Sequence, residues 1–257
     1  MQVVIMCGGT GTRLKEQTEF VPKPLIPIGG IPMVVHIMRL YAHYGFKDFV
    51  LALGYKQEAF KQYFAHYDLI NNTAIVHTGH SQPGHYHDYV DDGWKITMVD
   101  TGVNTLKGER LKMIEKYIIG DTFMLTYGDG VGNIDIRALL EFHKGHGKLA
   151  TITGVLPTSK FGEITLIGNT VAAFKEKEIS PREDYVVNAG FMVMDTKIFE
   201  HLKPGMDLET GLMSALVKLR SVMLYKHHGF WKNMDTLKDL QEFQEMWDEG
   251  DIKWRVE

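Results

Sequence analysis

A glycine-rich segment near the start of the chain has the composition of a phosphate-binding loop. Residues 8–14 read GGTGTRL and follow the short apolar run 3–6. Glycines let the backbone turn tightly and bring its N–H groups close to a ligand, and phosphate oxygens are the usual ligand of such a nest. A Walker A loop is excluded because no Gly-Lys-Ser/Thr follows. The dinucleotide fingerprint is excluded because Leu14 stands where its third glycine would.

Two cations lie close to this loop in the sequence. Arg13 belongs to it, and Lys23 lies between Pro22 and Pro24, which hold it on a stiff segment. Fixed cations beside a glycine nest suit a triphosphate. We expect neither cation to be buried in the absence of a ligand. The alternative interpretation is a structural turn followed by two solvated surface cations.

Two aspartates lie where a carboxylate can face a bound ligand or serve a turn or a helix end. Asp129 lies between two glycines at the end of an apolar run, where a strand of an α/β sheet meets its ligand crevice. Asp235 follows Met234, directly before a helical pattern. Taken alone, Asp129 can be a turn residue and Asp235 the N-cap of the following helix. If the carboxylate of Asp235 binds a ligand instead of capping the helix, the helix begins at Thr236.

The elements that position these residues alternate between apolar runs and helical patterns. Strands are predicted at residues 3–6, 49–53, 74–77, 96–99, 123–126, 149–155, 186–194 and 223–227. Helices are predicted at residues 32–44, 57–67, 134–144, 208–219 and 236–249. Residues 163–166 and 171–175 flank a turn and indicate a hairpin. The alternation predicts an α/β fold with a doubly wound, mostly parallel sheet.

A polar, turn-rich stretch at residues 79–93 is predicted to be a long loop, a kind of segment that is often functional. Histidines 77, 80, 85 and 87 lie in or beside it. Their spacing matches no zinc pattern, and no cysteine accompanies them. We interpret the stretch as a loop over the active site or at a subunit contact.

Composition excludes several classes of protein. The chain has 257 residues, 44% of them hydrophobic, and a formal net charge of −4 from 28 basic and 32 acidic residues. It is too apolar for a disordered chain, and its charge does not suggest a nucleic-acid-coating protein. A single cysteine, Cys7, excludes an internal disulfide. Neither a signal peptide nor a membrane-spanning run is visible, so we expect a soluble cytoplasmic protein.

The motifs, taken together, resemble those of one enzyme family. Residues 8–14 are followed by VPKPLIPIGG at 21–30, VDTG at 99–102, GERLK at 108–112, TYGDGV at 126–131 and GFWKNMDT at 229–236. In order and spacing this set resembles the sugar-1-phosphate nucleotidylyltransferases, and it is most similar to the branch that uses CTP and glucose 1-phosphate. The resemblance covers nearly the whole chain, from Met1 to about Trp254.

The resemblance implies a fold and an activity. It implies a single nucleotidyltransferase domain over residues 1–257, with a Rossmann-like, doubly wound mixed sheet and a small β insertion on the sugar-binding side. It also implies transfer of CMP from CTP to α-D-glucose 1-phosphate with Mg²⁺ as cofactor, and a homo-oligomer. The attacking phosphate oxygen is already anionic, so positioning and charge stabilisation are required rather than a general base.

The resemblance also assigns roles to individual residues. Arg13, Lys23 and Asp129 would be catalytic, and Asp129 and Asp235 would hold the Mg²⁺. Sugar-phosphate binding falls to Glu176, Lys177 and Asn188. Nucleotide binding falls to Met6, Gly8, Gly9, Thr10, Gly11, Thr12, Arg13, Lys23, Thr105 and Arg110.

Departures from the family pattern lie mainly on the sugar side. Glu178 replaces a usual proline, Ala189 replaces a frequent glycine, and Cys7 stands where alanine is usual, which we interpret as a buried inert thiol. The alternatives left open are a uridylyl- or thymidylyltransferase and a cytidylyltransferase for another phosphorylated substrate. A catalytically silent nucleotide-sugar-binding subunit is the alternative of a different class.

Overall fold

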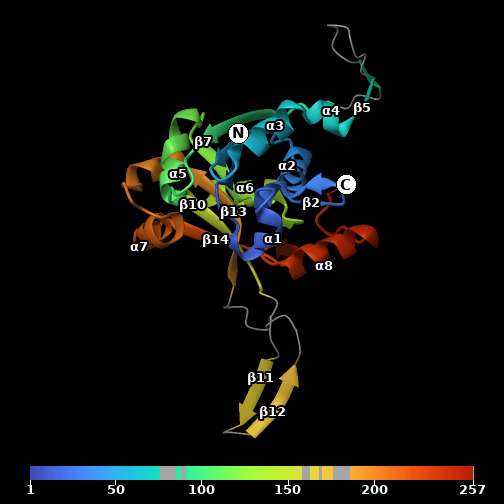
Figure 1. Ribbon diagram of the computed structural model, residues 1–257. Coiled ribbons are helices and arrows are strands. Elements are labelled where there is room, and N and C mark those ends of the chain that lie inside the picture. Colours follow the sequence, from blue (N-terminus) through green and yellow to red (C-terminus); the bar gives the residue numbers. More distant parts are fainter. Residues whose placement is uncertain (76–84, 88–90, 158–162, 168–169, 176–185, 257) are drawn as a thin grey trace.

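A seven-stranded sheet forms the centre of the molecule. The computed structural model describes residues 1–75, 85–87, 91–157, 163–167, 170–175 and 186–256 (Figure 1). Across the sheet the strands are β14 (Val222–His227), β10 (Ala150–Val155), β13 (Val187–Asp195), β8 (Thr122–Tyr127), β1 (Gln2–Cys7), β4 (Asp48–Leu53) and β7 (Lys95–Asp100). Strand β13 pairs antiparallel with β8 and β10, and the other pairings in this sheet are parallel.

Helices cover both faces of this sheet (Figure 1). One apolar core contains buried residues of α2 (Met33–His43), α3 (Gln57–Ala65), α6 (Ile136–His146) and α8 (Leu237–Asp248). The other contains buried residues of α5 (Lys107–Ile114), the 3-10 helix η4 (Thr196–His201), the π-helical turn η5 (Leu208–Met213) and α7 (Ser214–Lys218). This arrangement is the doubly wound architecture that the alternating pattern predicted.

Strand β1 shows why a continuous apolar run forms a central strand. All six of its residues are buried. Val3 and Ile5 belong to the first core, whereas Val4 and Met6 belong to the second. Because side chains alternate between the two faces of a sheet, only a strand covered on both faces buries every position.

The remaining elements are short and lie outside the central sheet. The short helices among these elements are η1 (Thr12–Leu14), α1 (Lys15–Thr18), η2 (Lys23–Leu25), α4 (Tyr67–Asn71) and η3 (Glu115–Tyr117). The two-stranded pairs are β2 (Pro27–Ile28) with β3 (Ile31–Pro32), β5 (Thr73–Ile75) with β6 (His85–His87), β9 (Gly130–Gly132) with β15 (Trp231–Asn233), and β11 (Glu163–Ile167) with β12 (Thr170–Lys175). The β11–β12 hairpin is the predicted insertion, placed between β10 and β13 along the chain.

The structure confirms the fold class and corrects some element boundaries. The helix predicted at 57–67 ends at Ala65, and a separate α4 begins at Tyr67. The helix predicted at 208–219 begins as a π-helical turn. Helix α5 was not predicted. Within the predicted loop 79–93, residues 85–87 form β6, while residues 79–84 and 88–90 lie outside the described residues, as do His77 and His80.

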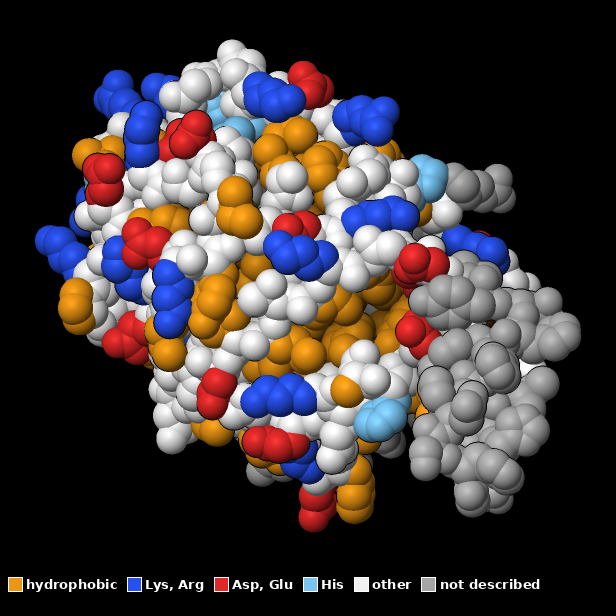
Figure 2. Space-filling view, turned by 90° about the horizontal axis from the view of Figure 1, so that it is seen from above, with side chains coloured by type: hydrophobic (Ala, Val, Ile, Leu, Met, Phe, Trp, Pro, Cys, Tyr) orange, Lys and Arg blue, Asp and Glu red, His pale blue; other side chains and the backbone are white. Residues whose placement is uncertain are grey.

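The surface carries charges of both signs. On the face in Figure 2, hydrophobic side chains gather near the centre, and basic and acidic side chains are interspersed around them. No helix among the described residues has the length and apolar character needed to cross a membrane.

Chain order across the sheet predicts where a ligand binds. From β1 the chain passes to β4 and then β7 on one side, and it later returns to β8 on the other side of β1. In open α/β sheets the ligand crevice lies beyond the carboxyl ends of the strands at such a reversal. The loop after β1 begins at Gly8, and the loop after β8 contains Asp129.

Candidate active site

A cavity of about 670 Å³ lies at this reversal in strand order. Its walls include the loops that follow β1 and β8, the loop before α5, and residues of β13 and β15. Every predicted site residue that the structure describes lines it: Met6, Gly8, Gly9, Thr10, Gly11, Thr12, Arg13, Lys23, Thr105, Arg110, Asp129, Asn188 and Asp235. Glu176 and Lys177 lie outside the described residues.

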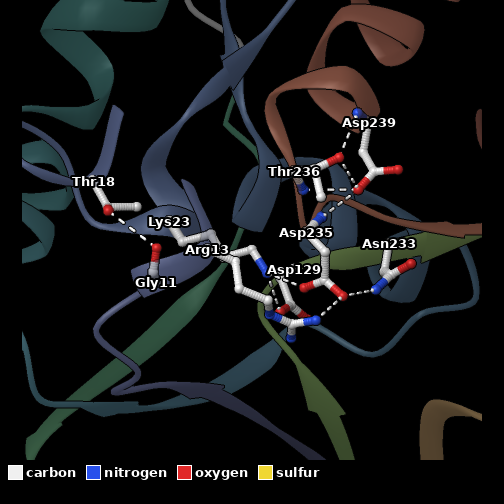
Figure 3. Close-up of polar contacts among 9 residues, drawn as sticks. All are labelled: Gly11, Arg13, Thr18, Lys23, Asp129, Asn233, Asp235, Thr236 and Asp239. Atoms are coloured by element: carbon white, nitrogen blue, oxygen red, sulfur yellow. Dashed lines mark hydrogen bonds and ion pairs between the residues drawn. The ribbon is translucent and has the colours of Figure 1, made fainter. Parts of the chain in front are cut away.

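The glycine-rich loop is held by local hydrogen bonds. Gly11 has φ +64°, a left-handed conformation that favours glycine. Its carbonyl accepts from the Leu14 N–H at 3.0 Å and from the Thr18 hydroxyl at 3.1 Å, the latter shown in Figure 3. The loop therefore turns directly into η1 and α1.

Pairing between β9 and β15 brings the two aspartates together. Gly130 pairs with Asn233 in this antiparallel ladder. Asp129 immediately precedes β9, and Asp235 follows β15 by two residues, so the register places both at the same end of the pair. The backbone N–H of Met234 donates to the Asp129 carbonyl at 2.8 Å, which fixes this end. Residues more than 100 positions apart thus form one carboxylate pair.

Both predicted cations contact these carboxylates. Lys23 Nζ lies 2.7 Å from Asp129 Oδ2 and 2.8 Å from Asp235 Oδ1. Arg13 Nη1 lies 2.9 Å from Asp235 Oδ2. Figure 3 shows Lys23 and Arg13 reaching the same carboxylate from one side. The site therefore contains two carboxylates and two cationic side chains in direct contact.

Arg13 and Lys23 differ in burial, and for Lys23 the burial differs from what we expected. The Arg13 side chain is 72% exposed, as expected, but the Lys23 side chain is only 11% exposed. The expectation that Lys23 would not be buried was wrong, because it took no account of the acidic partners that the fold places around this ammonium. A buried charge is tolerated when it is paired and hydrogen-bonded.

The charge state of Asp235 follows from its neighbours. Burial alone raises the pKa of this carboxyl, but the hydrogen bond and charge of Lys23, the charge of Arg13 and the Asn233 amide outweigh burial and hold the pKa below its usual value. Asn233 Nδ2 donates to Asp235 Oδ2 at 2.6 Å. Asp235 is therefore ionised at neutral pH, in the state that pairs with Lys23 and Arg13.

Asp235 is not the N-cap of α8. The Thr236 side chain caps the helix by accepting from the Asp239 N–H at 3.2 Å, and the Asp239 carboxylate accepts from the Thr236 N–H at 2.7 Å in a reciprocal capping box. The alternative in which the helix begins at Thr236 is therefore the one that the structure supports. The Asp235 oxygens accept instead from Lys23, Arg13 and Asn233.

The two carboxylates fit a magnesium ion. Mg²⁺ prefers one or two carboxylates and completes its octahedron with water and substrate phosphate oxygens. Asp129 and Asp235 already share one cation, and both line an open cavity. Within the described part of the chain, no three His, Cys, Asp or Glu side chains converge on a common point, so any further ligands would come from solvent or substrate.

Arg110 organises the backbone of the cavity. The residue is only 4% exposed. Its guanidinium donates to the carbonyls of Leu53, Gly102, Gly8 and Val103 and to the Thr101 hydroxyl, at 2.6 to 3.3 Å. Burial lowers the pKa of this guanidinium, against the opposing charge of Asp100. The predicted nucleotide-binding arginine therefore also joins the loops after β1 and β7 to the end of β4.

The close approach of Arg110 explains one glycine of the loop. A Cβ added at Gly8 would lie 2.2 Å from Arg110 Nη1. The Gly8 carbonyl accepts from Arg110 Nη2 at 3.0 Å, and the Tyr55 N–H lies 3.5 Å from the same oxygen. Any residue with a side chain at position 8 would displace the guanidinium.

Several cavity residues were missed by the sequence analysis. Tyr127 donates to Glu209 Oε1 at 2.6 Å, and Lys107 pairs with the same carboxylate while its Nζ lies 5.2 Å from the Tyr127 ring centroid. Trp231 Nε1 donates to the Ala189 carbonyl at 2.8 Å. Tyr127 and Trp231 both occur inside motifs quoted above, so their position was visible in the sequence although their role was not.

Two other predicted residues have defined places in the structure. Asn188 Oδ1 accepts from the Gly190 N–H at 2.8 Å, on the β13 wall of the cavity. Cys7 is 1% exposed, and burial, followed by the charge of Asp129, raises the pKa of its thiol. A buried protonated thiol is a poor nucleophile, which agrees with the interpretation of Cys7 as inert.

Comparison with known proteins agrees with the geometry. The family model described as nucleotidyl transferase matches residues 2–249. A protein of Bacillus subtilis (strain 168) named "Probable glucose-1-phosphate cytidylyltransferase" is 40% identical over 100% of both chains. The glucose-1-phosphate cytidylyltransferase of Salmonella typhimurium is 38% identical over 100% of this chain and 99% of its own.

Solved structures share the fold at lower identity. The inositol-1-phosphate CTP transferase of T. maritima has a TM-score of 0.65 and 18% identity, covering 97% of this chain and 96% of its own. HddC from Yersinia pseudotuberculosis has a TM-score of 0.66 and 20% identity, covering 96% and 99%. With the fold, the site and the full-length relatives in agreement, the chain belongs to the nucleotidyl transferase family of enzymes.

Proposed function

We propose that the enzyme transfers CMP from CTP to α-D-glucose 1-phosphate, giving CDP-glucose and pyrophosphate, with Mg²⁺ as cofactor. The convergence of Lys23, Arg13, Asp129 and Asp235 beside the glycine-rich loop is the observation that supports nucleotidyl transfer in this cavity. The choice of CTP and glucose 1-phosphate rests on the names of the two full-length relatives.

The reaction needs charge control more than proton transfer. A phosphate oxygen of the sugar phosphate attacks the α-phosphorus of the triphosphate, and the bond from that phosphorus to the bridging oxygen breaks. The bonding electron pair leaves with pyrophosphate. Two polyanions must therefore approach each other, which requires cations and N–H groups fixed in advance.

Residues of the chain supply these groups. The 8–14 loop presents backbone N–H groups to the phosphates, and Arg13 and Lys23 offset their charge. Asp129 and Asp235 would hold the magnesium ion. When bound, that ion supplies positive charge to the phosphate oxygens around the reacting phosphorus. Asn188, on the β13 wall, would hydrogen-bond the sugar.

Selection of cytosine requires an acceptor for its 4-amino group that would repel the O4 of uracil. The carbonyl of Gly8, next to the predicted nucleotide site, already accepts from Arg110 and faces the Tyr55 N–H. Another acceptor of the cavity must therefore discriminate. Asn104, from the loop before α5, is a candidate because it lines the cavity beside Thr105 and its side-chain amide includes an acceptor oxygen.

A matrix of five nucleoside triphosphates against several sugar 1-phosphates, with pyrophosphate detection, tests the proposal. We expect the highest kcat/KM with CTP and glucose 1-phosphate. Equal or better turnover with UTP or dTTP would replace cytidylyl by uridylyl or thymidylyl transfer. If none of the substrate pairs releases pyrophosphate, a catalytically silent binding subunit would be favoured.

We also propose that residues 1–257 act as one catalytic domain and that the enzyme is a homo-oligomer. The cavity takes residues from Met6 to Asp235, so a fragment that lacks either end of this range lacks part of the site. Light scattering of the purified enzyme tests the oligomer, and a monomer at micromolar concentration would contradict it.

A further inference from the structure

The ammonium of Lys23 occupies the point at which a small cation would bridge two carboxylates. It contacts Asp129 Oδ2 at 2.7 Å and Asp235 Oδ1 at 2.8 Å, one oxygen from each acid. A magnesium ion binds oxygen at about 2.0–2.1 Å, so the two oxygens would have to close further around it. The same lone pairs cannot serve both cations in this geometry.

The site is balanced in charge without a metal. Two carboxylates face two cations, because Arg13 contacts the second oxygen of Asp235 at 2.9 Å. Adding a divalent ion to this group, with no other anion present, would leave a net positive charge in a partly buried pocket. Adding the ion together with a triphosphate restores the balance, since the phosphates provide new partners for Lys23 and Arg13.

The ammonium of Lys23 can move away from the carboxylates while the backbone stays in place. Its backbone is fixed by Pro22 and by η2, where the Ile26 N–H donates to the Lys23 carbonyl at 3.1 Å. Its side chain is a flexible four-carbon stem that lines the cavity wall. A change of side-chain rotamer alone can therefore move the ammonium from the carboxylates toward the cavity.

We infer that Lys23 is an internal counter-ion that blocks the metal site until a polyphosphate draws it away, so that metal and nucleotide bind cooperatively. The inference rests on the proposed function in one respect, the assignment of Asp129 and Asp235 as metal ligands. By linkage, the factor by which triphosphate strengthens metal binding equals the factor by which metal strengthens triphosphate binding. Between turnovers, with no polyphosphate bound, these carboxylates would bind a metal ion only weakly.

Direct binding of Mn²⁺ in the absence of nucleotide tests this inference. Free Mn²⁺ is counted by electron paramagnetic resonance while the full chain is titrated. Wild type and Asp129→Asn should bind Mn²⁺ equally weakly, because the acid contributes nothing while Lys23 occupies it. Lys23→Met removes the charge and keeps most of the stem, and it should bind one Mn²⁺ at least about tenfold more tightly than wild type.

A matched control separates this effect from general loss of positive charge. Lys95 also pairs with an aspartate, its Nζ lying 3.1 Å from Asp48 Oδ2, but it lies on the exposed edge strand β7. Lys95→Met should bind Mn²⁺ as wild type does. Adding Asp129→Asn to Lys23→Met should abolish the gain, which assigns the new site to this carboxylate pair.

Two results would overturn the inference. The first is wild type that binds Mn²⁺ more tightly than Asp129→Asn without nucleotide, a comparison that needs no change at Lys23. The second is a folded Lys23→Met, or Lys23→Gln whose amide can still donate to a carboxylate, that binds no more tightly than wild type. Neither measurement uses turnover. If the substrate matrix excludes CTP while Lys23→Met gains the metal, the proposed function fails and the counter-ion role stands.

Discussion

Lys23 Nζ lies 2.8 Å from Asp235 Oδ1, although the two residues are 212 positions apart in the chain. The contact joins the start of η2 to the loop that enters α8. Both partners are at most 11% exposed in their side chains. Because this ion pair is well buried, a change at Lys23 or Asp235 should affect triphosphate binding, metal binding and the stability of the fold together.

Substitution of the two cations should separate catalysis from stability. Arg13→Ala and Lys23→Ala should each lower kcat/KM by about 10²–10³, the cost of losing one electrostatic stabiliser. Thermal melting should be unchanged in Arg13→Ala, because this side chain is 72% exposed. It should fall in Lys23→Ala, which leaves two carboxylates facing each other. Near-normal rates in both variants would exclude both cations from charge stabilisation of the reaction.

Substitutions at the neighbouring residues Asp235 and Thr236 should affect activity differently. Asp235→Asn keeps the size but loses the charge that Mg²⁺ requires, so activity should fall steeply and recover only partly at high Mg²⁺. It also removes a charged partner of Lys23 and should lower the free energy of unfolding by about 1–3 kcal/mol. Thr236→Ala removes only the cap and should cost about 1 kcal/mol with activity retained. Full activity of Asp235→Asn at limiting Mg²⁺ would discard the metal assignment.

Arg110→Lys should reveal the structural role of this residue. A lysine cannot donate to the five acceptors that the planar guanidinium reaches, so buried carbonyls would lose partners. We expect a lower melting temperature and a higher KM for the nucleotide, with a smaller effect on kcat. Unchanged melting with weakened nucleotide binding would instead assign Arg110 to direct ligand contact alone.

His36 should make the fold sensitive to acid. The Trp254 indole N–H donates to its Nδ1 at 3.3 Å, so Nδ1 is unprotonated and Nε2 donates to the Ile28 carbonyl at 3.1 Å. Burial lowers the pKa of His36 from 6.5 to about 4. Between these values the unfolded chain binds a proton that the folded chain does not, so stability falls as pH falls from about 6.5 to 4, by at most about 3 kcal/mol.

Melting curves across this pH range measure the effect. His36→Gln should be less stable at neutral pH but show a shallower decline toward acid. His143, whose pKa burial also lowers to about 4, retains its own share of the decline. The depressed pKa of Asp235 acts only at lower pH, below the usual carboxyl value of 3.8. An unchanged slope in His36→Gln would remove His36 from this account.

Much of the fold follows from the sequence because the main strands carry a strong signal. Continuous apolar runs such as β1 and β4 are buried on both faces, and Gly8 and Gly54 mark where they end. The ligand-facing positions of the glycine-rich loop and Asp129 follow for the same reason, since the carboxyl ends of parallel strands share one edge of the sheet. The resemblance to a known family then added the residues far along the chain, among them Asp235.

What could not be predicted depends on contacts between distant segments. Strands β9 and β15 have three residues each, too few for a pattern, yet their register sets the distance between Asp129 and Asp235. The burial of Lys23 follows from that pairing and not from its own neighbours in sequence. The break between α3 and α4 at His66 has no glycine or proline to announce it.

Competition among nucleotides in a single reaction tests the central claim most directly. Equal concentrations of CTP, UTP, dTTP, ATP and GTP are mixed with glucose 1-phosphate, Mg²⁺ and enzyme, and the nucleotide sugars are identified by mass spectrometry at low conversion. Since all five compete for one site, product ratios equal the ratios of kcat/KM. The account predicts that CDP-glucose predominates and is absent with Asp129→Asn. A predominance of UDP-, dTDP-, ADP- or GDP-glucose, or no nucleotide sugar at all, would contradict it.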